Sequence, residues 1–250
     1  TLDGNTFVPD AVNSGAVAIV TDKKNWEFDG FLNSNNVAKI VVENTRKALA
    51  DLSCEFFQHP SKKLKLVGIT GSNGKTTTAF YVKNLFENAG YKTGLLGTIS
   101  NIIGDSNEDS QLTTPESHTI NEYLHQMVSL GITHCVMEVS SHSLVLDRVR
   151  GLDFDYALFT NITSDHLDFH KNFENYFAAK KILFDGLKKS GTAIVNYDDA
   201  SSLRILSDCK ANKTTFGINE NSNYTISNVH YNMDGTRFSL KSFDNEFSFT

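Results

Sequence analysis

Residues 64–78 constrain the fold of this chain more than any other stretch. They read LKLVGITGSNGKTTT, so an apolar run leads into a glycine-containing turn that ends on a lysine and three threonines. This order predicts a buried strand, a phosphate-binding loop and the start of a helix. A plain glycine turn with a solvated lysine is the alternative interpretation. The stretch therefore indicates an α/β domain with a nucleotide site.

The loop offers groups that suit a bound nucleotide. Backbone N–H groups at Gly71 and Gly74 can turn toward an anion, Lys75 adds a positive charge, and the hydroxyl of Thr76 can bind Mg²⁺. The spacing departs from the common phosphate loop, because Gly68 lies one place too early to be its leading glycine.

Composition limits the possible classes of protein. The net charge of −6 argues against a general nucleic-acid binder, which needs a basic surface. Cys54, Cys135 and Cys209 lack metal-ligand spacing, so we expect buried, reduced thiols. We see neither a bilayer-length apolar run nor a signal-like start, so we expect a soluble intracellular protein. Because Thr1 is not a natural initiator, we expect the chain to be a fragment.

The first 60 residues predict a small α/β unit. Residues 16–20 and 39–42 are short apolar runs typical of buried strands, and residues 44–57 have a helical pattern. The residues expected on the inward face of that helix are Ala48, Leu49, Leu52 and Phe56. The polar segment 59–63 contains a proline and predicts a boundary, so we expect domains over 1–60 and 61–250.

Helices and strands alternate in the second part. The predicted helices are 75–89, 117–130 and 173–187, and the predicted strands are 94–99, 134–139, 156–160 and 192–196. That order favours a mostly parallel sheet with helices on its faces. Residues 224–231 and 237–240 alternate in polarity and predict an antiparallel hairpin. The expected fold is α/β: a small α/β unit, then a P-loop NTPase-like domain with an antiparallel β extension.

Polar residues follow two of the predicted strands. Glu138 ends the run 135–139, where its carboxylate could hold Mg²⁺ or simply face solvent. Ser140 follows and could touch a substrate or cap a helix. The segment 165–170, DHLDFH, suggests a metal or phosphate site, a zinc-like set if it is extended, or a plain polar loop.

Lys180 falls within an apolar helical stripe. At 100° per residue it lies in the middle of the face formed by Phe173, Phe177, Phe184 and Leu187. A buried lysine has a lowered pKa, and its neutral amine can react with CO₂ to give a metal-binding carbamate. Helical geometry alone favours a lysine that extends its amine to solvent.

Several motifs together resemble the Mur ligases. They lie at residues 70–78, 112–116, 137–142, 148–151, 159–161, 165–170 and 179–180. The order and spacing are those of the family, and the match extends to residues 3–7 and 10–16. The segments LTTPE and MEVSSH favour the branch of the family that adds the third amino acid of the peptide.

The resemblance implies a cytoplasmic, ATP- and Mg²⁺-dependent ligase of peptidoglycan synthesis. It would join UDP-N-acetylmuramoyl-L-alanyl-D-glutamate to a free amino acid, meso-diaminopimelate or L-lysine, through an acyl phosphate. Neither nucleic acid nor membrane insertion is expected, and the protein is expected to be a monomer. Residues 1–60 would be a remnant of the UDP-substrate-binding domain, and 61–250 the ATP-binding domain. The early uridine-binding region would precede Thr1, and the domain that selects the amino acid would follow Thr250.

The resemblance also implies roles for single residues. The implied ATP-binding residues are Gly71, Ser72, Asn73, Gly74, Lys75, Thr76 and Thr77. The implied catalytic residues are Lys75, Glu138, His166 and Lys180. Thr76 and Glu138 would hold one Mg²⁺, and His166 with carbamylated Lys180 a second. The implied substrate-binding residues are Thr113, Thr114, Ser140 and Arg148. Leu146 stands where some members have a substrate-binding glutamine.

Two alternatives stay open. A folylpolyglutamate synthetase would have a similar phosphate loop, but the Thr-Thr-Pro and Ser-Ser-His segments argue against it. A nucleotide-binding module without catalysis would have little need for the set Lys75, Glu138, His166 and Lys180. We expect the isolated 250 residues to fold and bind nucleotide weakly, but not to ligate.

Overall fold

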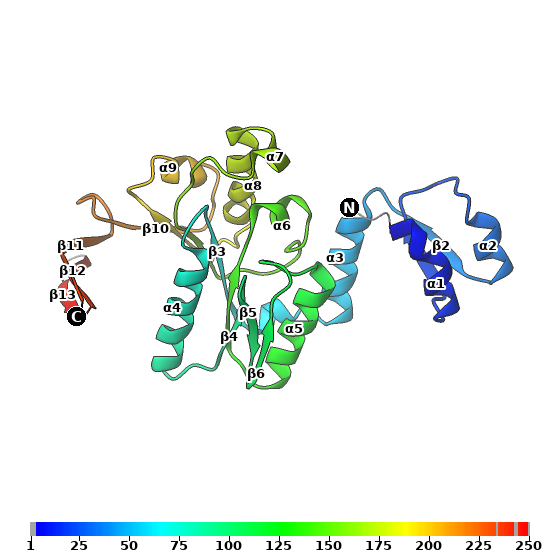
Figure 1. Cartoon of the computed structure of the whole chain (residues 1–250), viewed down its shortest axis with the longest axis horizontal. Coiled ribbons are helices and arrows are strands. Elements are labelled where there is room, and N and C mark those ends of the chain that lie inside the picture. Colours follow the sequence, from blue (N-terminus) through cyan, green and yellow to red (C-terminus); the bar gives the residue numbers. More distant parts are fainter. Residues whose placement is uncertain (1–3, 234, 243–244, 250) are drawn as a thin grey trace.

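The computed structural model describes residues 4–233, 235–242 and 245–249. A small N-terminal unit lies at one end of an elongated molecule, a central α/β body follows, and the C-terminal strands lie at the other end (Figure 1). The described residues form a two-stranded sheet, β1-β2, and an 11-stranded sheet of order β13-β12-β11-β10-β9-β8-β3-β7-β4-β5-β6. The predicted α/β fold is confirmed.

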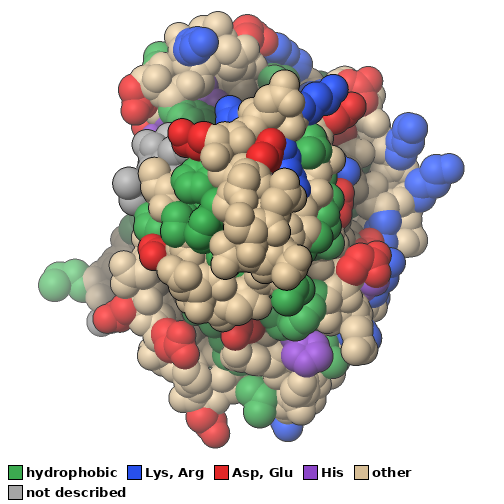
Figure 2. Space-filling model, turned by 90° about the vertical axis from the view of Figure 1, so that its right-hand side faces the viewer, with side chains coloured by type: hydrophobic (Ala, Val, Ile, Leu, Met, Phe, Trp, Pro, Cys, Tyr) green, Lys and Arg blue, Asp and Glu red, His purple; other side chains and the backbone are tan. Residues whose placement is uncertain are grey.

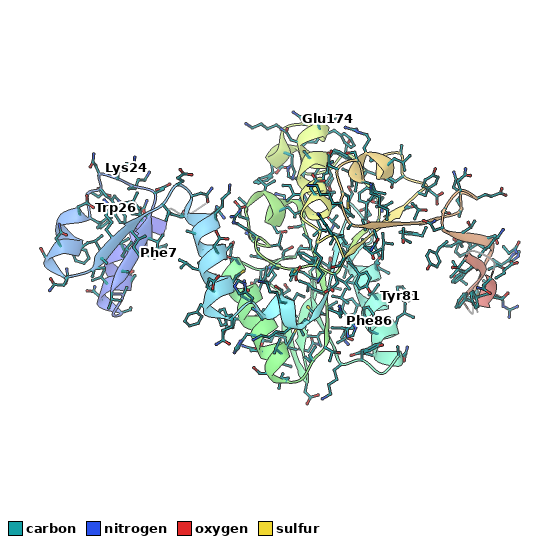
Figure 3. The ribbon with its side chains drawn as sticks, turned by 180° about the vertical axis from the view of Figure 1, so that it is seen from behind. Phe7, Lys24, Trp26, Tyr81, Phe86 and Glu174 are labelled. Carbon is teal, nitrogen blue, oxygen red and sulfur yellow. The ribbon has the colours of Figure 1, made fainter. Side chains whose placement is uncertain are left out.

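The N-terminal unit is built around a short parallel pair of strands. Its elements are η1 (Gly4–Phe7), α1 (Val8–Asn13), β1 (Ala18–Thr21), α2 (Asp29–Ser34) and β2 (Ala38–Val41). Val8, Leu32 and Val37 form its core, against which Trp26 packs. Trp26 and Phe7 lie well apart from the central body (Figure 3). Both strands were predicted to within a few residues, but the expectation of burial was wrong for β2, in which Ile40 and Val41 are exposed. The six-residue helices α1 and α2 were too short to show a period.

Helix α3 (Thr45–Phe56) joins this unit to the central body. Asn44 caps it, because its Oδ1 accepts hydrogen bonds from the backbone of Arg46 and Lys47 at 3.0 Å. The predicted inward face was wrong: Leu52 and Phe56 are 55% and 79% exposed. The helix packs against α5 of the central body through another face, whose buried residues are Ala50, Ser53 and Cys54. In a view from the end of the molecule that carries the N-terminal unit, hydrophobic side chains are visible between charged ones (Figure 2).

The predicted parallel sheet forms the centre of the molecule. Its parallel strands are β3 (Lys65–Thr70), β4 (Thr93–Leu96), β7 (His134–Glu138), β8 (Tyr156–Phe159), β9 (Thr192–Asn196) and β10 (Asn212–Gly217). Strand β3 lies between β7 and β8, with Ile69 opposite Glu138 and Thr70 opposite Phe159. The ends of these three strands therefore meet at one edge of the sheet.

Antiparallel hairpins extend the sheet on both sides. The predicted hairpin is present as β11 (Tyr224–Asn232) and β12 (Gly235–Ser242), and β13 (Asn245–Phe249) adds to it. On the other side, β5 (Ser100–Ile103) and β6 (Ser106–Asp109) form an unpredicted hairpin next to β4. All four residues of β6 are exposed and two are acidic, so they carry no apolar alternation that would reveal a strand.

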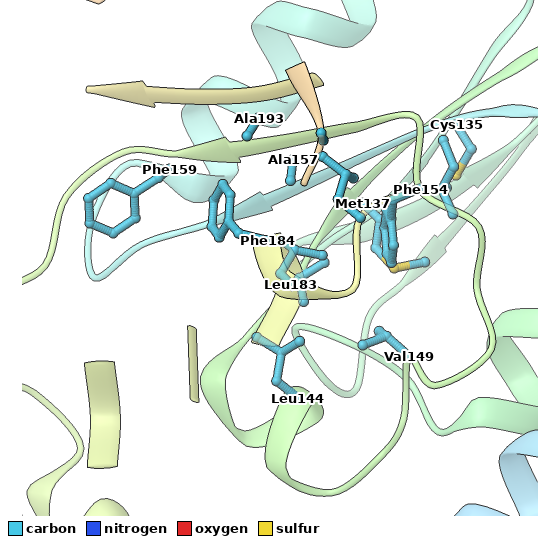
Figure 4. Close-up of a cluster of buried hydrophobic side chains, with 14 of the residues drawn as sticks. Cys135, Met137, Leu144, Val149, Phe154, Ala157, Phe159, Leu183, Phe184 and Ala193 are labelled. Atoms are coloured by element: carbon cyan, nitrogen blue, oxygen red, sulfur yellow. The ribbon is translucent and has the colours of Figure 1, made fainter. Parts of the chain in front are cut away.

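Helices cover both faces of the sheet. The longer ones are α4 (Lys75–Asn88), α5 (Ser117–Ser129) and α8 (Phe173–Asp185), and the short ones are η2 (Pro60–Lys63), α6 (Ser141–Val145), α7 (Leu167–His170) and α9 (Ser202–Ile205). Val67 and Ile69 face α4, whereas Leu66 belongs to the larger core on the other face. There Met137, Phe159 and Phe184 pack together (Figure 4).

Two further expectations can be compared with the structure. The three cysteines are buried and unpaired, as predicted. Within the described ranges, none of the helices combines the length and apolar character needed to cross a membrane. The domain boundary near residue 60 stays a prediction.

Candidate functional site

The phosphate loop lies between β3 and α4, where the end of β8 holds it. The Asn73 N–H donates to Asn161 Oδ1 at 3.0 Å, and Asn161 Nδ2 and Thr160 Oγ1 donate to Asn73 O at 3.1 and 2.7 Å. Gly71 has φ +152°, and a Cβ there would collide with Thr160 Oγ1. The loop is thus fixed from the side of β8, and a glycine is needed where the two segments meet.

Lys75 begins α4 and folds its amine back onto the loop. Its Nζ donates to the carbonyl oxygens of Gly71 and Ser72, both at 3.0 Å. Burial lowers the pKa of Lys75, while Glu138 and Asp165 act in the opposite direction. The amine therefore lies at the loop with a counter-charge nearby, where it can turn to a bound phosphate.

Glu138 is completely buried at the end of β7. Its Oε2 accepts a hydrogen bond from Thr76 Oγ1 at 2.9 Å, and its Oε1 accepts one from the Thr98 N–H at 2.8 Å. The interpretation of a carboxylate facing solvent is therefore wrong. Thr98 also was not predicted; the available signal was its place just after β4, the strand next to β7.

The four residues expected to bind substrate converge beside Glu138. Thr114 Oγ1 donates to Glu138 O at 2.9 Å and accepts from the Ser140 N–H at 3.0 Å. The hydroxyl oxygens of Thr113 and Thr98 lie 3.2 Å apart, within hydrogen-bond distance. Ser140 also caps α6, since its Oγ accepts from Ser143 N at 3.1 Å, so the capping alternative holds as well.

Arg148 reaches the same cluster. One guanidinium nitrogen donates to Thr114 O at 3.0 Å, and another lies 2.7 Å from a carboxylate oxygen of Glu116. Its Nε is buried and has no hydrogen-bond partner. A guanidinium next to the Thr-Thr-Pro segment suits an anionic substrate group.

Lys180 is buried, with 1% of its surface exposed. Its Nζ donates to Gly71 O at 2.9 Å and lies 4.3 Å from the centre of the Tyr176 ring. Burial, with the charge of Lys75 as a smaller cause, lowers the pKa of Lys180 to about 7. The solvent-reaching lysine favoured by helical geometry is therefore wrong, because the phosphate loop covers this end of the α8 face.

Tyr176 also was not predicted. Its hydroxyl lies 3.0 Å from Ser72 Oγ, which in turn accepts a hydrogen bond from Thr163 N at 3.0 Å. Tyr176 therefore connects the phosphate loop with the segment after β8 while its ring faces Lys180. Its position four residues before Lys180, on the same helical face, was the signal in the sequence.

The segment 165–170 is not extended, so its predicted alternation is wrong. His166 has φ +52°, and α7 follows directly. His166 is half-exposed, and its ring centre lies 6.1 Å from that of Tyr176. His170 is buried instead, 2.9 Å from Ser141 Oγ. Among the described residues, no cluster of three or more His, Cys, Asp or Glu side chains could hold a metal ion, so the zinc-like alternative is not supported.

Replacing Lys180 with methionine is expected to change how stability depends on pH. The folded-state pKa of about 7 lies below the usual 10.5, so the unfolded state binds more protons between these values. Stability of the unmodified protein should thus rise with pH across that window, by about 2 kcal/mol between pH 7 and pH 9. The stability of the Lys180→Met protein should lack this rise with pH, because methionine does not titrate.

Urea unfolding of both proteins at pH 7 and pH 9 measures the effect. Lys181→Met is the matched control, because the Lys181 amine forms ion pairs with Asp185 and Asp208. A difference between wild type and Lys180→Met that stays constant with pH would contradict the lowered pKa.

The strand–loop–helix of β3 and α4, with a buried carboxylate at the end of the neighbouring strand, defines an α/β protein with a P-loop-like fold. Residues 69–250 match the family model described as "Mur ligase middle domain". The chain belongs to the Mur ligase family, as its motifs predicted.

Curated relatives agree with this assignment. The chain is 46% identical over 240 residues to UDP-N-acetylmuramoyl-L-alanyl-D-glutamate--2,6-diaminopimelate ligase 1 of Clostridium acetobutylicum. The aligned residues make up 96% of this chain and 48% of that protein. It is 44% identical over 236 residues to the corresponding ligase of Clostridium botulinum, covering 94% of this chain and 48% of that protein. The chain thus spans about half the length of the curated relatives it matches.

Solved structures show the same fold. A UDP-N-acetylmuramoyl-L-alanyl-D-glutamate--2,6-diaminopimelate ligase aligns with a TM-score of 0.83 at 26% identity, over 98% of this chain and 49% of that one. MurF from Thermotoga maritima in complex with ADP aligns with a TM-score of 0.61 at 25% identity, over 99% and 52%. A folylpolyglutamate synthase of Mycobacterium tuberculosis, at 13% identity and a TM-score of 0.64 over 81% and 53%, shares the fold alone.

Proposed function

We propose that the full-length protein is an ATP-dependent ligase of peptidoglycan synthesis. It would add 2,6-diaminopimelate, with L-lysine as the alternative, to UDP-N-acetylmuramoyl-L-alanyl-D-glutamate. The observation that carries the proposal is that Lys75 and Lys180 both donate to Gly71 O, at the phosphate loop. The names of the 43–46% identical relatives support this substrate and favour diaminopimelate.

The reaction converts a poor acylating group into a good one. The γ-carboxylate of D-glutamate takes the terminal phosphoryl group of ATP, so that ADP leaves and an acyl phosphate forms. The amine of the incoming amino acid then attacks the acyl carbon, phosphate leaves, and the nitrogen loses a proton. Both steps concentrate negative charge on phosphoryl oxygens, where Lys75 and the N–H groups of the loop would stabilise it.

The residues present fit Mg²⁺. Thr76 and Glu138 bring a hydroxyl and a buried carboxylate within 2.9 Å of each other, an oxygen set of the kind that this ion prefers. When bound, Mg²⁺ would neutralise charge on the phosphate oxygens. We propose His166 and a carbamylated Lys180 as the second set, since both flank the Tyr176 ring.

The burial of Lys180 supports the proposed carbamate. A neutral amine adds to CO₂ and loses one proton, so an R–NH₂ group becomes R–NH–COO⁻. With a pKa of about 7, half of the Lys180 amine is neutral near pH 7. The product is a carboxylate, which binds Mg²⁺ as an amine cannot.

Thr113, Thr114, Ser140 and Arg148 are proposed to bind the muramoyl dipeptide. Residues 1–60 would contribute to a domain for its UDP part, residues 61–250 would form the ATP-binding domain, and the cytoplasm is the proposed location. Formation of the UDP-linked tripeptide, identified by its mass after incubation with ATP, Mg²⁺ and each amino acid in turn, tests the proposal. ATP binding without tripeptide formation with any amino acid would refute it.

Arg148→Ala is expected to weaken binding of the dipeptide substrate. Loss of a charged donor should raise its KM about tenfold or more, while the affinity for ATP stays close to that of the wild type. Steady-state kinetics with varied dipeptide, together with ATP titration, measure both. Arg150→Ala is the matched control, because Arg150 pairs with Asp51 on the surface. An unchanged KM would remove Arg148 from the substrate site.

A further inference from the structure

Gly97 and Thr98 follow β4 and lie against the Glu138 carboxylate. Strand β4 is parallel to β7 with Leu96 opposite Met137, so the next residues reach the end of β7, where Glu138 lies. Thr98 engages both carboxylate oxygens: its N–H donates to Oε1 at 2.8 Å and its Oγ1 to Oε2 at 3.1 Å. Two hydrogen bonds from one residue fix the plane of the carboxylate.

Gly97 makes this approach possible. A Cβ at position 97 would lie 2.6 Å from Glu138 Oε1, closer than real Cβ contacts come. The absence of a side chain therefore lets the backbone of residues 97 and 98 reach a carboxylate that is itself fully buried. The pair forms a cradle that any larger residue at position 97 would disturb.

The Glu138 carboxylate accepts one hydrogen bond that a bound cation would displace, from Thr76, and two that can remain, from Thr98. Its two oxygens offer about four acceptor positions, and Thr76 and Thr98 fill three of them. A cation held between Thr76 and Glu138 needs a lone pair of the Thr76 hydroxyl, so the proton of that hydroxyl must turn away from the carboxylate. The bonds from Thr98 do not have to change, and they can hold Glu138 while the cation binds.

The Thr98 hydroxyl also reaches the Thr-Thr-Pro segment. Its oxygen lies 3.2 Å from Thr113 Oγ1 as well as 3.1 Å from Glu138 Oε2. A hydroxyl has one proton, so when it donates to Glu138 it can only accept from Thr113. Thr98 thus lies between the proposed cation ligand and the proposed substrate residues.

We infer that Thr98 is a positioning residue that holds Glu138 ready for a divalent cation bound with a nucleotide. The inference rests on the proposed function, since it takes Glu138 as the cation ligand. Thr98 acts through Glu138, and its hydroxyl is the part that side-chain substitution can remove. The backbone N–H stays in any variant.

Titration of the full-length protein with a non-hydrolysable ATP analogue, in Mg²⁺ and in EDTA, tests the inference. Thr98→Val keeps the shape of the side chain and removes the hydroxyl; its affinity in Mg²⁺ should fall about tenfold, with little change in EDTA. Thr98→Ser keeps the hydroxyl and should stay within about twofold of the wild type. Thr133→Val, the same change at an exposed residue just before β7, should have no effect.

Three results would overturn the inference. Wild-type affinity of Thr98→Val in Mg²⁺ would show that the hydroxyl is not needed, and tighter binding would show that it competes with the cation. An equal loss in Mg²⁺ and in EDTA would show a purely structural role. If the wild type binds the analogue but gains nothing from Mg²⁺, the cation site of the proposed function fails first, and the inference with it.

Gly97→Ala provides a second, independent variant. The added methyl group would push on Glu138 Oε1. The affinity for the ATP analogue in Mg²⁺ should therefore fall as in Thr98→Val, although the hydroxyls of Thr76 and Thr98 remain. Melting temperatures without ligand identify any variant that fails to fold. If a folded Gly97→Ala protein binds the ATP analogue with the same dependence on Mg²⁺ as the wild type, close approach of residues 97 and 98 to Glu138 is not needed for cation binding, which contradicts the inference.

Discussion

Lys180→Ala is expected to abolish most ligation by the full-length protein while nucleotide binding remains. We expect the rate of tripeptide formation to fall about a thousandfold, because the substitution removes a charge-stabilising group from a buried site. The phosphate loop keeps its own contacts to Asn161 and Thr160, so ATP still has its binding site. Rates of tripeptide formation and ATP titration on the same preparation measure the two effects separately.

The adjacent lysine supplies the control for this result. Lys181→Ala changes the same kind of residue on the same helix, but Lys181 is paired with Asp185 and Asp208 away from the loop. Its variant should ligate at close to the wild-type rate. Unchanged turnover in Lys180→Ala would rule out a catalytic role for this lysine. A ¹³C carbamate signal from labelled bicarbonate, present in wild type and absent from Lys180→Ala, would identify the modified group.

Lys75→Met is expected to have the second largest effect. It removes the positive charge that the structure places at the carbonyls of Gly71 and Ser72. Since that charge would act on phosphoryl oxygens, the ligation rate should fall about a hundredfold to a thousandfold, and ATP affinity should fall as well. Rates at saturating dipeptide, combined with ATP titration, separate the two losses.

Lys83→Met is the matched control for Lys75. Lys83 lies on the same helix, α4, about two turns after Lys75. Its amine is 2.7 Å from a carboxylate oxygen of Glu87. Its loss should leave both ATP affinity and turnover near the wild-type values. If Lys75→Met binds ATP and ligates as well as this control, the phosphate-loop assignment is wrong.

The sequence predicted the structure best where the local residue pattern alone determines the element, as it does at the phosphate loop. The run 64–78 predicted β3, the loop and α4, because a strand before glycines and a helix after them leave few other folds. Short helices such as α1 and the exposed strand β6 have too few residues or too little apolar contrast to show a period. Their positions depend on neighbours that are distant in the sequence.

The site shows the same division. Lys75, Glu138 and Lys180 stand in motifs that make them candidates, whereas the contacts of Thr98 with Glu138 and of Tyr176 with Ser72 arise only in the fold. The face of α3 was wrong because its partner is α5, a contact between distant residues that a helical period cannot identify. His166 lies in a left-handed conformation, which strand-like alternation cannot represent.

Phosphate release by the full-length protein tests the central claim most directly. With ATP and Mg²⁺ present, the account predicts rapid release only when both UDP-N-acetylmuramoyl-L-alanyl-D-glutamate and one amino acid are added, and that amino acid identifies the third residue. Release without the dipeptide, or no release with any amino acid while ATP still binds, would contradict it.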